Sequence, residues 1–201
     1  MKISKIAQLC KKRQTVAMFA TEAGLWVGDG SSMYLLPEFC DISADGLALA
    51  FGISAQNEKI RFYRLEDMEK SYDLHDLTER GESICEQIDL GLWIGEDKIR
   101  PYKTEAGILF LKASRLAPLK EELENGEVYL RYETNGQPYF AVKCGMILCA
   151  IITPMQMLSE GFMERLEDLR DLCRVQYQNE KAKQLAAETQ IKMSEAAGEE
   201  D

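Results

Sequence analysis

Residues 107–155 read GILFLKASRLAPLKEELENGEVYLRYETNGQPYFAVKCGMILCAIITPM, and this stretch decides the predicted fold. An apolar strand opens it, and residues 114–123 predict a capped helix in which Pro118 must lie in or near the first turn. Three strands are then predicted at 128–133, 139–143 and 146–153, with a turn at Asn135-Gly136 between the first two. The stretch therefore predicts a helix followed by a meander.

The N-terminal part of the chain repeats this order. Residues 4–13 predict a short amphipathic helix with Ser4 as its cap, and the turn Asp29-Gly30 predicts a hairpin. The expected strands are 16–20, 25–27 and 33–36. Aligning Ser4 with Ser114 brings Gly24 onto Gly136, so we expect an α+β protein built from two pseudo-symmetric αβββ units whose helices lie side by side. The alternative is a chance alignment of two short helices with hairpins.

Between the two units the pattern is less regular. A helix is predicted at 43–51, a strand at 59–65, and a long charged connection with one helical turn at 66–88. The motif GLWVGDG at 24–30 returns as GLWIGED at 91–97, and the two copies hold the only tryptophans. The two motifs are out of register in the αβββ alignment. We therefore interpret them as two separate hairpins of the same kind, in which a Leu-Trp strand is followed by a turn made of glycine and an acidic residue.

The C-terminal part predicts one amphipathic helix, residues 158–193, after a domain of residues 1–157. Residues 194–201 are expected to form an acidic disordered tail. An apolar stripe on the helix consists of Phe162, Leu166, Leu169 and Cys173. By default this stripe packs on the core, and the alternative is that it binds a partner helix.

The charge distribution is uneven. A net charge of −10 argues against non-specific binding of polyanions, but it leaves room for a local basic face. The first thirteen residues hold five cations and no acid, namely Lys2, Lys5, Lys11, Lys12 and Arg13. Two interpretations remain open, an exposed helix whose last cations oppose the helix dipole, and a weak contact with a DNA backbone.

Chemical motifs are missing. The six cysteines include no C-x-x-C pair, His75 is the only histidine, and the loop at 28–31 lacks the Gly-Lys-Ser/Thr ending that binds phosphates. Cys144 and Cys149 are five residues apart, so they would lie on opposite faces of a strand if one regular strand included both, and they are poor common metal ligands. We therefore expect no cofactor, no metal, no small-molecule substrate and no enzymatic activity. The short apolar runs and the free cysteines predict a cytoplasmic protein without membrane contact.

The order of elements in residues 107–155, closed by an apolar strand ending in Pro154-Met155, is similar to one domain of the DNA sliding clamps, the replication processivity factors. The resemblance covers residues 1–157 and implies a non-enzymatic accessory module acting on double-stranded DNA or on a replication protein, as a homo-oligomer. It implies DNA contacts from cations on the helices. The residues that match these positions are Lys5, Lys11, Lys12, Arg13 and Arg115.

The chain also departs from the clamp pattern. Bacterial chromosomal clamps carry three such domains and this chain has room for one, which would suit a phage or prophage protein. Its second helix carries Glu121, Glu122 and Glu124 against Arg115 and Lys120, so this half of the expected DNA-facing surface lacks the basic character of a clamp. The alternative is a small regulatory protein on the same scaffold that binds a protein partner through its C-terminal helix, without DNA contact.

Overall fold

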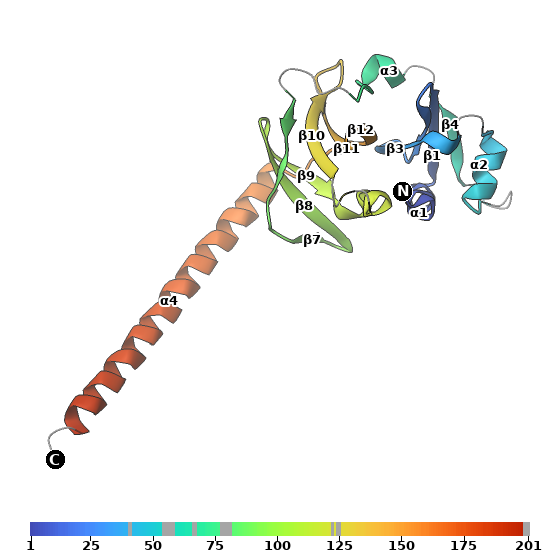
Figure 1. Cartoon of the computed structure of the whole chain (residues 1–201). Coiled ribbons are helices and arrows are strands. Elements are labelled where there is room, and N and C mark those ends of the chain that lie inside the picture. Colours follow the sequence, from blue (N-terminus) through green and yellow to red (C-terminus); the bar gives the residue numbers. More distant parts are fainter. Residues whose placement is uncertain are drawn as a thin grey trace. The chain divides into compact units, whose positions relative to one another are not determined.

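The computed structural model describes residues 1–39, 42–53, 59–65, 68–76, 82–121, 123 and 126–198. The chain forms two compact units, Met1–Met155 and Gln156–Asp201. The first unit contains two β-sheets with short helices, and the second contains one long helix, so the predicted α+β class is confirmed (Figure 1).

An eight-stranded sheet forms the centre of the first unit, in the order β4-β1-β2-β3-β12-β11-β10-β5. Its strands are β1 (Thr15–Thr21), β2 (Gly24–Gly28), β3 (Ser32–Leu36), β4 (Arg61–Arg64), β5 (Ser83–Ile84), β10 (Gly126–Tyr132), β11 (Pro138–Cys144) and β12 (Ile147–Ile152). The two predicted meanders are present, and they meet where β12 pairs with β3, with Ala150 opposite Tyr34. All neighbours are antiparallel except β1 and β4.

The predicted turn between β2 and β3 is confirmed, and one buried carboxylate closes it. Asp29 Oδ1 accepts hydrogen bonds from the backbone N–H of Ser31 at 2.9 Å, and from the N–H and hydroxyl of Ser32 at 2.8 and 3.0 Å. A Cβ on Gly28 would lie 1.7 Å from the Ser32 carbonyl oxygen, so only glycine fits there. The residue types of this loop are therefore explained by hairpin geometry.

Helical elements cover one face of the sheet. α1 (Ile3–Arg13) buries Ile6, Ala7 and Cys10 there, as its amphipathic pattern predicts. Its N-terminus lacks the predicted side-chain cap from Ser4, and the Lys2 N–H instead donates to the Pro118 carbonyl at 2.8 Å.

The helix predicted at 114–123 is wrong. The described residues up to 121 form two short 3₁₀ turns there, η2 (Ala113–Arg115) and η3 (Ala117–Leu119). Pro118 is the physical cause, because it has no N–H to donate and restricts the residue before it. Leu116 and Leu119 still join the same core cluster as Ile6, so these turns lie on the α1 side of the sheet.

Residues 68–76, in the described part of the connection at 66–88, cover the opposite face. The connection contains the predicted helical turn, α3 (Met68–Ser71), and two short strands, β5 and β6 (Glu86–Gln87), that were not predicted. Met68 packs into a second core cluster together with Trp26 and Tyr139. Tyr72 stacks edge-on against Tyr139, with ring centroids 5.1 Å apart. Both faces of the large sheet are therefore buried.

A second sheet forms around β8 (Asp97–Thr104). β9 (Gly107–Lys112) pairs along one edge of β8, while β6 and β7 (Leu92–Ile94) share its other edge. Leu109 and Leu111 of β9 and Tyr102 of β8 reach the first core cluster. Two further elements, η1 (Pro37–Phe39) and α2 (Ala44–Ala50), follow β3, and Ser43 caps α2 by accepting a hydrogen bond from the Gly46 N–H at 3.1 Å.

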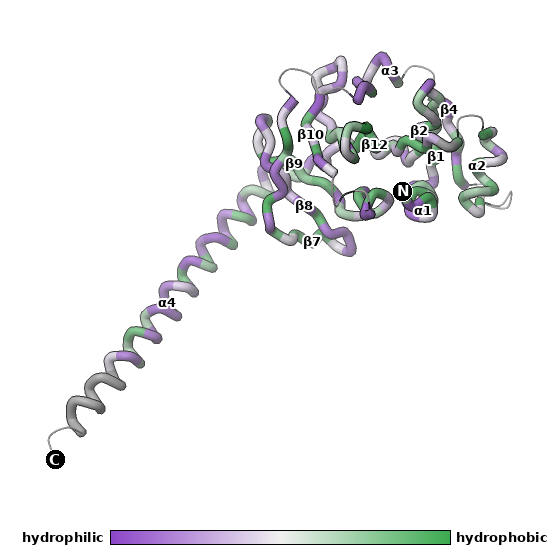
Figure 2. The backbone as a smooth tube through the Cα atoms, in the orientation of Figure 1, coloured by the Kyte–Doolittle hydropathy of each residue, from purple (hydrophilic) through white to green (hydrophobic). Residues whose placement is uncertain are grey.

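The second unit consists of α4 (Glu160–Gly198) and the segment before it. The helix begins two residues after the predicted start at 158 and includes residues 194–198, which were assigned to the tail. In Figure 2, apolar and polar positions alternate along the coloured part of α4.

Candidate functional site

The cations predicted to contact DNA lie on two elements of the first unit. Lys5 and Lys12 point away from the buried face of α1, and Lys11 and Arg13 are also exposed. Lys12 Nζ lies 3.2 Å from Asp97 Oδ1, and Lys112 Nζ lies 2.7 Å from Oδ2 of the same carboxylate. The hydrogen bond from Lys112 is the main reason that the pKa of Asp97 lies below its usual value. One of the α1 cations is thus partly neutralised.

Arg115, the fifth predicted cation, contacts backbone on either side of the seam between β3 and β12. Its guanidinium donates to the carbonyls of Ser31 at 3.0 Å and Thr153 at 3.1 Å. Its own carbonyl accepts a hydrogen bond from the Tyr34 hydroxyl at 2.7 Å. These bonds give Arg115 a structural role, and DNA binding by the five cations stays a prediction.

A buried cluster of charged residues lies on the opposite face of the large sheet. Glu82 receives hydrogen bonds from Arg131 Nε at 2.7 Å and from Lys143 Nζ at 2.9 Å, and all three side chains are buried. Arg131 also donates to the carbonyls of Asp73 and His75, and the Lys143 ammonium lies 4.6 Å from the centre of the Tyr129 ring. The cluster joins the connection to β10 and β11.

The electrostatics of this cluster favour the ionised acid. Burial alone raises the pKa of Glu82, but the hydrogen bonds from Arg131 and Lys143 outweigh it and hold the pKa below its usual value. Sequence reasoning missed the cluster because Glu82 stands in a charged segment without a clear period, which predicts only a long connection. A signal was present, since Arg131 and Lys143 interrupt otherwise apolar strands. The cluster stabilises the fold and offers no exposed reactive group.

No single regular strand includes both Cys144 and Cys149, so the condition for placing them on opposite faces of a strand is not met. They belong to β11 and β12, and Cys149 falls at a bulge between Leu148, opposite Lys143, and Ala150, opposite Val142. The hydrogen bond between the two thiols raises the pKa of Cys144 and lowers that of Cys149. Two thiols in contact do not complete a metal site.

The apolar stripe predicted on α4 is present within the helix. Its residues follow one another at spacings of four, three and four, which places them on one face of an α-helix. Leu169 is 56% exposed, and Leu172 and Val175, which lie on other faces of the helix, are exposed as well. Among the described residues of the second unit there is no other helix or strand that could cover the stripe.

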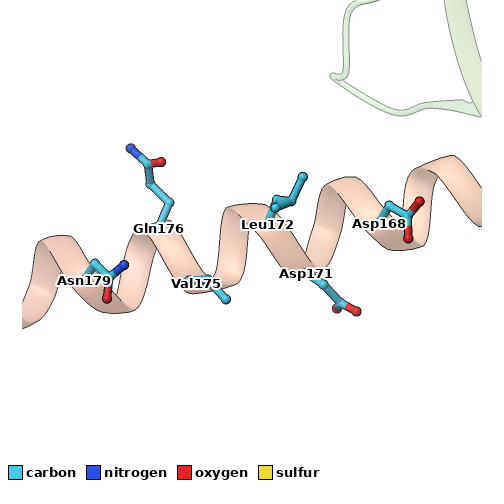
Figure 3. A pocket seen from close by; sticks show the side chains of 6 residues that line it. All are labelled: Asp168, Asp171, Leu172, Val175, Gln176 and Asn179. Atoms are coloured by element: carbon cyan, nitrogen blue, oxygen red, sulfur yellow. The ribbon is translucent and has the colours of Figure 1, made fainter.

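A shallow hollow lies along α4 from Asp168 to Asn179, on a different face from the stripe. Figure 3 shows that its six lining side chains all come from this one helix. Their positions repeat at intervals of three and four residues, so the hollow is a helix face without a second wall. Such a face can receive another protein surface, but it cannot enclose a small molecule.

Other chemistry is not assembled in the described part of the chain. No three His, Cys, Asp or Glu residues there are placed to hold a metal ion. The backbone N–H of His75 donates to Asp73 Oδ1 at 3.0 Å, and the His75 carbonyl accepts a hydrogen bond from Arg131. The backbone of this histidine therefore contacts the buried cluster.

None of the described helices is both long enough and apolar enough to cross a membrane.

The comparisons with known proteins give no family. No family model, no curated protein and no solved structure matches this chain.

Proposed function

We propose that this chain is a non-enzymatic interaction protein that binds a protein partner through α4. The observation that carries the proposal is the stripe Phe162, Leu166, Leu169 and Cys173 on a helix that is alone in its unit. An isolated helix gains little stability from its own propensity, and most helical stability in proteins comes from packing an apolar face. The stripe is therefore the face that a partner would cover.

The chemistry of the stripe's surroundings indicates the kind of partner. Between residues 160 and 171 the helix carries five acids and two arginines. The acids are Glu160, Glu164, Glu167, Asp168 and Asp171. A partner protein with an apolar groove and with lysine or arginine at the rim of that groove would match both the stripe and these charges.

The test compares three forms of the full chain as bait in lysate from the source cells. Leu166→Ser with Leu169→Ser removes the centre of the stripe, and Leu185→Ser is the matched control, since Leu185 and Leu169 are both 56% exposed. We expect one protein to be retained by the wild type and the control and lost with the double variant. Equal capture by all three forms would contradict the proposal.

A clamp-like module acting on DNA is the second candidate, and two observations favour it. The meanders β1–β3 and β10–β12 join into one sheet, with α1 and the turns η2 and η3 on the same face. This order supports the proposed pseudo-symmetric duplication. Lys5, Lys11 and Arg13 are exposed on that face, where a clamp would contact DNA.

Salt dependence tests this second candidate. If the three cations contact phosphates, changing them together to Gln should reduce the slope of log affinity against log salt by about 0.9 for each lost contact. Changing Lys70 and Lys103, exposed lysines elsewhere, serves as the control. No measurable affinity for duplex DNA at low salt would exclude this candidate and would leave the α4 proposal untouched.

A further inference from the structure

The two tryptophan motifs occupy different places in the fold. Trp26 lies in β2 with a strand on each side, opposite Phe19 of β1 and Leu35 of β3, and it is 2% exposed. Trp93 lies in β7, which among the described strands pairs only with β8, and it is 67% exposed. The same local sequence thus forms a strand with two neighbours in one place and a strand with one neighbour in the other.

The backbone of Trp93 is directed toward the unpaired edge of β7. A two-residue turn, Gly95-Glu96, places Ile94 opposite Asp97, and the φ of +59° at Gly95 suits a tight hairpin turn. Such a turn makes Ile94 and Asp97 a hydrogen-bonded pair, and paired residues alternate between bonded and non-bonded along an antiparallel ladder. Trp93 and Lys98 are therefore a non-bonded pair, and the N–H and C=O of Trp93 point away from β8.

Apart from the short length of β7, three residues, the described residues give this edge none of the usual protection against pairing. Residues 90–95 read LGLWIG, without charge or proline, and Leu90 and Ile94 are exposed beside Trp93. Exposed edge strands are normally protected by charged side chains, proline or a covering element. No described strand pairs with the outer edge of β7.

We infer that this edge pairs with β7 of a second copy of the chain, antiparallel and centred on Trp93. About a two-fold axis, the Trp93 residues of the two copies exchange both backbone hydrogen bonds, and Leu92 of each copy faces Ile94 of the other. No charged side chain falls within the three strand positions, so the self-pairing brings no like charges together. The two indole rings gain an aromatic cross-strand contact.

The inference rests on residues outside α4, so it stands or falls independently of the proposed function. Three residues from each copy form a small interface, and the dimer should be weak, which requires measurements from micromolar to millimolar protein. Trp93 is itself the probe. Because Trp26 is buried, acrylamide quenching of tryptophan fluorescence in the full chain reports mainly on Trp93.

The experiment combines this quenching with sedimentation equilibrium on the full chain and three variants. Trp93→Lys places a charge at the centre of the edge, Trp93→Phe keeps an aromatic strand, and Leu49→Lys adds the same charge at an exposed leucine of α2. We expect wild type, Trp93→Phe and Leu49→Lys to dimerise, and wild-type quenching to fall as concentration rises. Trp93→Lys should raise the dissociation constant about thirtyfold or more, as loss of a central interface tryptophan does.

Three results would overturn the inference. One is equal self-association of wild type and Trp93→Lys. Another is a wild type that stays monomeric over the whole concentration range. The third is weak quenching that does not change with concentration, because the edge would then be covered by the chain's own residues. Circular dichroism and melting of the two lysine variants show whether Trp93→Lys is folded, and Trp93→Phe keeps the inference testable if it is not.

Discussion

Glu82 and Lys143 form an ion pair of 2.9 Å in which each side chain is 3% exposed, although they stand 61 positions apart in the sequence. Arg131 shares the same carboxylate. The pair links the connection between the two meanders to the middle of the large sheet. Without Glu82, two buried cations on β10 and β11 would lose their shared acid, so this residue should be important for stability.

Replacing this acid should destabilise the fold strongly. Glu82→Gln keeps the shape but removes the charge, and breaking a buried ion pair from one side costs about 3 kcal/mol or more. Urea unfolding followed by circular dichroism measures the loss. The control is Glu121→Gln, since the Lys2–Glu121 pair of 2.8 Å is largely exposed and should contribute little. An equal loss of unfolding free energy in the two variants would show that the buried ion pairs stabilise the fold no more than the exposed pair does.

The contribution of Glu82 should depend on pH in one direction. Because its pKa is lowered in the folded state, the stabilisation is fully present above the unfolded-state pKa of about 4.3 and is lost as pH falls through the folded-state pKa. The difference in unfolding free energy between wild type and Glu82→Gln should therefore stay level from neutral pH to about pH 5 and shrink below it. A difference that persists unchanged into strong acid would refute this.

Asp29 should act as a turn residue without binding any ion. Asp29→Ala leaves the buried Ser32 N–H and hydroxyl without their acceptor, which should cost about 2 kcal/mol. Thermal unfolding of this variant, with the exposed Asp89→Ala as control, tests the size of the effect. Adding calcium or magnesium should leave the melting temperature of the wild type unchanged, and a rise would instead support an ion site at this loop.

The cysteines should differ sharply in reactivity. Burial raises the pKa of Cys10 to about 12 and that of Cys85 to about 11, while Cys173 is exposed. Alkylation depends on the thiolate and on access, so iodoacetamide near pH 8 should modify Cys173 long before Cys10 or Cys85. Peptide mass mapping over time follows the order. Early modification of Cys10 would mean that the packing of α1 on the sheet opens readily.

Local patterns allowed much of this fold to be predicted. Turn residues such as Asp29-Gly30 and Asn135-Gly136 locate hairpins because their backbone preferences depend on few neighbours. The helix at 114–123 failed because Pro118 outweighed an apparently helical pattern. The stripe on α4 followed from spacing alone.

The sequence did not allow us to predict which residues far apart in the chain contact one another. Nothing in the segment around Glu82 distinguishes this residue from a surface acid, and the two cations on β10 and β11 do not tell which acid they pair with. Likewise the motif GLWIGED predicts a strand at Trp93 but does not tell whether that strand has one neighbour or two. Both features depend on strand order, which local propensity does not determine.

The central claim is that the stripe on α4 is a partner-binding face, and site-specific photo-cross-linking in the source cells tests it most directly. A photoreactive phenylalanine is placed at position 169, on the stripe, or at position 185, off the stripe on the same helix. We predict one dominant cross-linked protein from position 169 that is missing from position 185. The same products from both positions, or none from position 169, would contradict the claim.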